Sequence, residues 1–248
     1  MNSSGILNVM QKVAERVAIP LVRDFGEIEK LQISRKGFKN FVTSADRNTE
    51  AKIVRELSKV HPEYSFLCEE TGYIENRDKS NIWIIDPIDG TNNFMRGIPY
   101  FAVNIALKQG EAITAGMTID PIRGDCYKSE QGRGAYVGYK NRLRVSGKTT
   151  IEEATIATRT GVKILDTLFQ KGAFVRQMGS TALDLALLAS GKFDAVIAMA
   201  VNLWDIASGI ILVKESGGFV KVEKTEDKYN IIAASTKKLL DICISVLD

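Results

Sequence analysis

The sequence contains few of the features that define several large protein classes. Its three cysteines, Cys68, Cys126 and Cys243, lack CxxC spacing and cannot all pair with one another. This argues against a disulfide framework or a thiolate zinc site. No apolar run reaches the roughly 20 residues of a membrane-spanning helix, and the first residues lack the basic start and apolar block of an export signal. We therefore expect a cytoplasmic protein with no membrane-embedded part.

An excess of one charge sign is also missing, because 33 Lys and Arg are balanced by 30 Asp and Glu. Direct nucleic-acid binding is therefore not indicated. Two short basic segments, 35–39 and 140–144, are either ordinary solvated loops or attract an anionic substrate. No GxxxxGK[ST] loop is present, which argues against a nucleotide-dependent transferase. The single histidine, His61, lies in a predicted turn, so serine-histidine or histidine-phosphatase chemistry is poorly supported.

The hydrophobic pattern of these 248 residues predicts a globular α+β protein with a sizeable core. Apolar spacing of three or four residues predicts a helix over 4–25, bent at Pro20, and a second helix between Ser44 and His61. Short apolar runs at 64–68 and 81–85 predict strands, and both end in acidic residues. Between 101 and 145, strand-like runs broken by Gly, Asp and Pro predict a meandering antiparallel sheet.

After residue 150, strands and helices are predicted to alternate. The pattern predicts strands at 155–158, around Val175 and at 193–198, and helices at 162–170, 181–189 and 205–216. Because no Gly/Ser/Pro-rich linker interrupts the chain, we expect two packed halves that form one cooperative unit with a cleft between them. The halves are predicted to span 1–145 and 146–248.

The most informative segment is NIWIIDPIDGTNNF. Its apolar strand is expected to deliver Asp86, with Pro87 ending the sheet pairing and Asp89 following three residues later. Neighbouring carboxylates repel one another, so such pairs persist when a cation neutralises them or when they share a proton. The amides of Gly90 and Thr91 are expected to open a short helix and to bind phosphate oxygens. The alternative is a tight turn, in which Asp and Gly are common.

Two more acids stand at the ends of predicted elements. Glu69 ends the strand at 64–68, and Asp205 is the predicted N-cap of the helix IASGIILVKES. Asp is itself a common structural N-cap. Together with Asp86 and Asp89, however, these acids predict a site for a hard cation such as magnesium, which prefers oxygen ligands.

Four segments, FVTSAD (41–46), FLCEETG (66–72), WIIDPIDGTNNF (83–94) and LWDIASGIILVKESGG (203–218), make the chain resemble the inositol monophosphatase family along its whole length. GILNVM, RDFGEIE and SRKGFKNFVTSADR are most similar to its bacterial SuhB branch. The resemblance implies a layered α-β-α-β-α fold of the sugar-phosphatase type. It also implies a homodimer and magnesium-dependent hydrolysis of a small phosphate monoester of a polyol or sugar, such as inositol 1-phosphate.

The resemblance further implies a role for individual residues. Glu69, Asp86 and the Ile88 carbonyl would bind one Mg²⁺, Asp86, Asp89 and Asp205 a second, and a third, weaker ion would lie near Glu69. Glu69 and Thr91 would orient the magnesium-activated water for in-line attack, with Asp46 hydrogen-bonded to the Thr91 hydroxyl. The substrate would contact Lys36, Ile88, Asp89, Gly90, Thr91, Arg176, Gly179, Ser180, Thr181 and Asp205.

One departure from the family pattern affects substrate choice. Ala198 stands six residues before Trp204, where the family usually has a glutamate that bonds the inositol ring. Its loss predicts a preference for inositol 1-phosphate weakened by roughly 1.5–3 kcal/mol. Fructose 1,6-bisphosphate, histidinol phosphate and adenosine 3',5'-bisphosphate remain alternative substrates. A SuhB-like binding role with transcription antitermination factors is the alternative to enzymatic activity.

Overall fold

The computed structural model describes residues 5–32 and 38–247. Side chains are described for all of these residues except 29–32 and 38–43. The helices are α1 (Gly5–Gln32), α2 (Phe38–Ser58), α3 (Thr91–Arg96), α4 (Val162–Gln170), α5 (Thr181–Ala189), α6 (Leu203–Glu215) and α7 (Lys237–Ser245). The first eight strands are β1 (Tyr64–Cys68), β2 (Gly72–Ile74), β3 (Asp78–Asp89), β4 (Ala102–Gln109), β5 (Ala112–Asp120), β6 (Asp125–Glu130), β7 (Gly134–Val137) and β8 (Asn141–Arg142). The remaining strands are β9 (Thr155–Arg159), β10 (Phe174–Arg176), β11 (Ala195–Val201), β12 (Phe219–Lys224) and β13 (Tyr229–Ala234).

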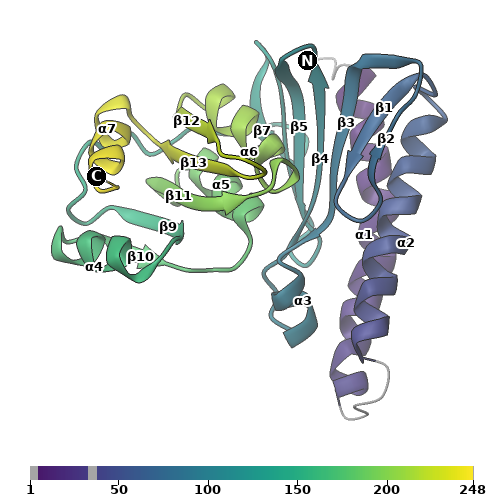
Figure 1. Ribbon diagram of the computed structural model, residues 1–248, viewed down its shortest axis with the longest axis horizontal. Coiled ribbons are helices and arrows are strands. Elements are labelled where there is room, and N and C mark those ends of the chain that lie inside the picture. Colours follow the sequence, from purple (N-terminus) through teal and green to yellow (C-terminus); the bar gives the residue numbers. More distant parts are fainter. Residues whose placement is uncertain (1–4, 33–37, 248) are drawn as a thin grey trace.

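The elements form alternating layers of helices and sheets (Figure 1). Helices α1 and α2 cover one face of an eight-stranded sheet with the order β2-β1-β3-β4-β5-β6-β7-β8. Helices α5 and α6 lie between this sheet and a five-stranded sheet with the order β10-β9-β11-β13-β12. Helices α4 and α7 pack on the outer face of the second sheet. The expected α-β-α-β-α layering is therefore confirmed.

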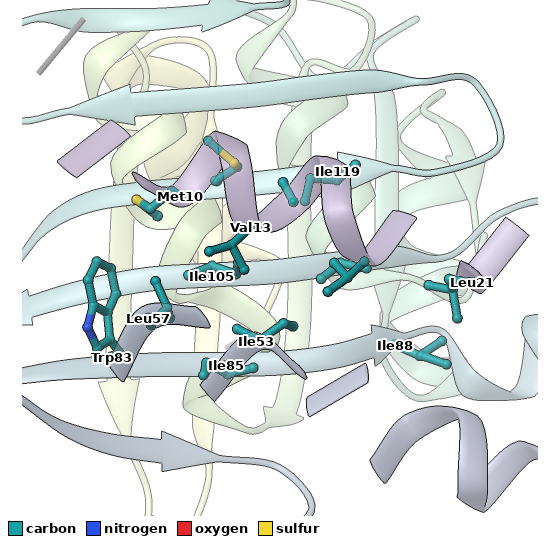
Figure 2. Packing of buried hydrophobic residues seen from close by; sticks show 14 of the residues in the cluster. Met10, Val13, Leu21, Ile53, Leu57, Trp83, Ile85, Ile88, Ile105 and Ile119 are labelled. Carbon is teal, nitrogen blue, oxygen red and sulfur yellow. The ribbon is translucent and has the colours of Figure 1, made fainter. Parts of the chain in front are cut away.

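One of the two large core clusters lies between α1, α2 and the first sheet (Figure 2). Met10 from α1 and Ile53 and Leu57 from α2 are fully buried against Trp83 and Ile85 of β3. Burying a side chain of this size stabilises the fold by about 1.5–3 kcal/mol. This packing fixes the position of β3, and with it the position of Asp86 and Asp89 among its last residues.

Helix α6 approaches its neighbours unusually closely. A Cβ atom at Gly209 would lie 2.4 Å from Cδ1 of Leu185 in α5, and one at Gly116 of β5 would lie 2.6 Å from Cγ2 of Ile211 in α6. Both positions therefore require glycine. This close packing sets the depth of α6, and with it the position of Asp205 in its first turn.

Most predicted elements are present, with several shifted boundaries. Helices α4 and α5 occupy the predicted residues, whereas α1 runs beyond Pro20 to Gln32 and α2 begins before Ser44. The prediction that Pro87 ends sheet pairing is wrong. Asp86 pairs with Asn104 and Asp89 with Ala102 of β4, because a bulge between them accommodates the proline. Within the described ranges, no helix is long and apolar enough to cross a membrane.

Candidate active site

A cavity of about 640 Å³ opens where β3, the end of β9 and the first turns of α5 and α6 meet. The cavity is therefore lined by residues from both the first and the second part of the chain. Its lining residues are Glu69, Asp86, Ile88, Asp89, Gly90, Thr91, Asn92, Asn93, Thr158, Arg159, Thr160, Gly161, Gln177, Gly179, Ser180, Thr181, Asp184, Met199, Asn202 and Asp205.

Three carboxylates gather at the floor of this cavity. One oxygen atom from each of Asp86, Asp89 and Asp205 lies within 4.8 Å of the others, and all three side chains are buried. Burial, together with the charge of Asp205, raises the pKa of Asp89 to about 8. Burial and the charge of Glu69 raise the pKa of Asp86 well above its usual range. Such crowding is unfavourable unless a cation or protons compensate the charge.

Asp89 is held in place by the start of α5. Its Oδ2 accepts hydrogen bonds from the Ser180 hydroxyl at 2.5 Å and from the Ala182 amide at 2.7 Å. Ser180 also caps α5, accepting from the Leu183 amide at 3.3 Å. The N-terminal end of a helix favours a negative charge. The second half of the chain therefore fixes a carboxylate that the first half supplies.

Asp205 lies one turn deeper in its helix than predicted. The N-cap of α6 is Asn202, and Asp205 is the third residue of the helix, where its Oδ2 accepts from the Asn202 amide at 3.0 Å. The prediction of an N-cap Asp205 is therefore wrong, and a capping box takes its place. Arg159 Nη1 lies 3.7 Å from Asp205 Oδ2, with its side chain 63% exposed.

The turn after β3 differs from expectation in one hydrogen bond. The Thr91 hydroxyl donates to the Ile88 carbonyl at 3.0 Å, and the Ile88 amide donates to Asp86 Oδ1 at 3.0 Å. Gly90, with φ of 93°, then allows α3 to begin, as predicted. The Thr91 hydroxyl thus donates to Ile88 and not to Asp46 as expected, and the buried Oδ1 of Asp46 has no hydrogen-bond partner among the described residues. Burial and three nearby glutamates raise its pKa to about 8.

One predicted substrate residue, Arg176, does not line the cavity. It is exposed on β10, where its guanidinium donates to the Val175 carbonyl at 3.0 Å. Lys36 lies outside the described residues. Ala198 is 1% exposed and packs in the core beside α5 and α6, while its neighbour Met199 reaches the cavity. The Ala198 side chain is therefore not part of the cavity wall, and the loss of a substrate contact at this position stays a prediction.

Several lining residues were not predicted from the sequence. Asp184 accepts from the Tyr100 hydroxyl at 2.7 Å, and burial raises its pKa to about 7. The sequence signal that could have identified Asp184 is its position as the single acid in the otherwise apolar helix TALDLALLA. Asn93 Nδ2 donates to the Tyr100 carbonyl at 2.7 Å and to the Met178 carbonyl at 2.8 Å, joining the two halves at the cavity rim. No local pattern marks such a contact.

These carboxylates suit a hard divalent cation. Their oxygen atoms are the ligand type that magnesium prefers, they converge within one ion's reach, and the buried Asp46 oxygen still has unused acceptor capacity. The layered fold is that of the sugar-phosphatase type.

The chain belongs to the inositol monophosphatase family, whose family model matches residues 3–247. It is 46% identical over 220 residues to an inositol-1-monophosphatase of Caulobacter vibrioides, covering 84% of this chain and 86% of that protein. It is 33% identical over 251 residues to the Nus factor SuhB of Haemophilus influenzae, covering 96% and 94%. The crystal structure of the extragenic suppressor protein SuhB from Bartonella henselae matches with a TM-score of 0.88 and 36% identity, covering 98% and 99%. Family membership and these names support a phosphatase of this type.

Proposed function

We propose that the protein is a magnesium-dependent phosphatase that hydrolyses a small phosphate monoester of a polyol or sugar. The observation that carries this proposal is the convergence of Asp86, Asp89 and Asp205 within 4.8 Å in a cavity that is open to substrate. Inositol 1-phosphate is the first candidate substrate, since relatives named inositol-1-monophosphatase share up to 46% of the matched sequence.

The cation ligands would be Glu69, Asp86, the Ile88 carbonyl, Asp89 and Asp205, arranged around two or three magnesium ions. When bound, magnesium supplies charge neutralisation on the phosphate and lowers the pKa of water. The Ile88 carbonyl already accepts from Thr91 and keeps a second lone pair for this purpose.

The chain's own groups account for binding and orientation. The amides of Gly90 and Thr91 at the start of α3 would receive phosphate oxygens. Glu69 lines the cavity and its pKa is raised, mainly by burial. It would therefore accept a proton from the attacking water more readily than an ordinary carboxylate. The Thr91 hydroxyl would orient that water, and Asp89, fixed by Ser180, would keep its geometry during the reaction.

The rest of the wall favours a substrate rich in hydroxyl groups. Thr158, Thr160, Gln177 and Thr181 line the cavity and carry hydroxyl or amide groups, as expected for a polyol or sugar. Arg159 adds a positive charge near the rim. Arg176 and Ala198 are not part of this proposal.

Phosphate release from a panel of small phosphate monoesters tests the proposal directly. The wild type is measured with magnesium and with EDTA, beside Asp89→Asn, which removes a cation ligand, and Asp166→Asn, which removes an exposed acid of α4. We expect release that requires magnesium, that Asp166→Asn retains and that Asp89→Asn loses by at least about 100-fold. Release that survives EDTA and Asp89→Asn would contradict the proposed site.

A second candidate function is binding to the transcription machinery, favoured by the match to the Nus factor SuhB over 96% of the chain. Capture of antitermination factors from cell extract by wild type and by Asp89→Asn would test it. Binding by both variants would support a role independent of hydrolysis. We further propose that the protein is a homodimer, which light scattering would test. We also propose that it is located in the reducing cytoplasm, which fits its three free cysteines.

A further inference from the structure

Glu69 enters the cavity from the short stretch of chain that joins β1 to β2. Its amide donates to the Ile85 carbonyl at 3.2 Å, which continues the pairing of β1 with β3 for one more residue. The following amides, of Glu70 and Thr71, have left the strand pairing. How they are held determines where the Glu69 carboxylate lies.

A single side chain from outside the sheet holds these amides. Glu50 Oε2 accepts from the Glu70 amide at 2.8 Å, and Glu50 Oε1 accepts from the Thr71 amide at 3.0 Å and the Thr71 hydroxyl at 2.8 Å. Glu50 lies on α2, which runs beside β1 at this edge of the molecule (Figure 1). One carboxylate therefore satisfies three donors that flank a cavity acid.

The anchoring of Glu50 is rigid. Its side chain is 1% exposed, and Ile53 and Leu57, on the same helix, are fully buried against the first sheet. Glu70 points elsewhere, with its Oε2 3.5 Å from Nε of Arg47. Of the two adjacent acids, Glu69 is thus the one that lines the cavity.

A carboxylate at position 50 is an unfavourable choice for a merely structural clamp. Its charge adds to the repulsion that raises the pKa values of Asp46 and Glu69, although burial is the larger cause for both. No ion pair with Glu50 is present in the parts of the chain that the structure describes. Only a carboxylate, however, offers two acceptor oxygens and no donor, which three converging donors require.

We propose that Glu50 is a positioning residue that fixes Glu69 in the geometry needed to bind the cation. The inference rests on the proposed metal-dependent function. Outer groups that orient metal ligands typically change metal affinity 10- to 100-fold when they are replaced, and we expect a loss of this size for Glu50.

Three substitutions separate positioning from through-space charge. Glu50→Gln keeps the size of the side chain but removes its charge. Its NH₂ group replaces one acceptor oxygen and would face an N–H or O–H donor of Glu70 or Thr71. Glu50→Asp keeps the charge but shortens the reach to the turn. Thr71→Val removes one of the three hydrogen bonds and leaves Glu50 intact. The control is Glu56→Gln, which removes a buried acid of α2 that pairs with Arg16 and Lys59.

Two measurements on the full chain are needed, and neither is catalytic activity. Hydrogen exchange of the Glu70 and Thr71 amides in EDTA reports how firmly Glu50 holds these two amides. Calorimetric titration with Mg²⁺ reports the affinity for the cation. We expect both Glu50 variants to speed this exchange and to weaken magnesium binding about 10- to 100-fold, with a smaller effect of Thr71→Val. Glu56→Gln should leave both unchanged even where it lowers the Tm.

Each other outcome has a definite meaning. Magnesium affinity retained by Glu50→Asp but lost by Glu50→Gln would replace positioning by a charge effect, and wild-type affinity in both would overturn the inference. If wild-type protein itself binds no magnesium, the proposed function fails instead. The exchange data then still show whether Glu50 holds the turn.

Discussion

Replacing Asp184 by Asn removes a buried carboxyl group of α5 that accepts a hydrogen bond from the Tyr100 hydroxyl. Burial raises the pKa of Asp184 from its ordinary value of 3.8 to about 7, against the opposing effect of the Tyr100 hydrogen bond. The folded protein therefore holds this proton more tightly than the unfolded chain. Asn keeps an oxygen that can accept from Tyr100, so the substitution removes the titration and little else.

The sign and size of the effect follow from proton linkage. Because the folded-state pKa is the higher one, stability is retained at low pH and lost as pH rises from about 4 to 7, by about 1.4 kcal/mol for each pH unit. Between pH 5 and pH 7, wild type should therefore lose about 2 to 3 kcal/mol that Asp184→Asn does not lose. Above pH 8 the two curves should run parallel.

The assay is urea unfolding in EDTA at several pH values, which keeps the cavity free of divalent cations. The difference in unfolding free energy between Asp184→Asn and wild type is plotted against pH. Asp166→Asn, at an exposed position on α4, serves as the control and should follow wild type. Parallel curves for Asp184→Asn and wild type between pH 5 and pH 7 would refute the assignment of a raised pKa to Asp184.

Four further outcomes are expected. Gly209→Ala should destabilise the fold by about 1–3 kcal/mol in urea unfolding, because the new methyl group meets Leu185, although Ala usually favours a helix; unchanged stability would contradict the close packing. Magnesium at 100 times its Kd should raise the unfolding free energy of wild type by about 2.7 kcal/mol, which thermal unfolding would show as a higher Tm. Asp205→Asn should not show this rise. Ala198→Glu should unfold or aggregate, whereas Met199→Glu should fold and alter the ranking of substrates. A single unfolding transition by fluorescence and circular dichroism would support one cooperative unit, and two transitions would argue against it.

Local pattern was sufficient for the elements whose signal lies within one segment. Helices α4 and α5 follow from spacing that repeats every three or four residues, and the strand at 64–68 from a short apolar run. The acids Glu69, Asp86 and Asp89 could be found because they stand at the ends of apolar strand segments: Glu69 follows β1 directly, and Asp86 and Asp89 lie among the last four residues of β3. The final hairpin and helix, β12, β13 and α7, were not predicted, although they complete the second sheet and its outer layer.

The sequence by itself pointed to the four acids that line the cavity and to the family of the chain, because these depend on residue type and order. Tertiary structure alone decided how the acids are held. Ser180 bonds Asp89 across 91 positions of sequence, and Glu50 reaches the Glu69 turn across 20. Tertiary packing also places Ala198 in the core and allows β3 to continue past Pro87. Such contacts join segments whose local patterns are independent, so they arise only when sheets and helices pack together.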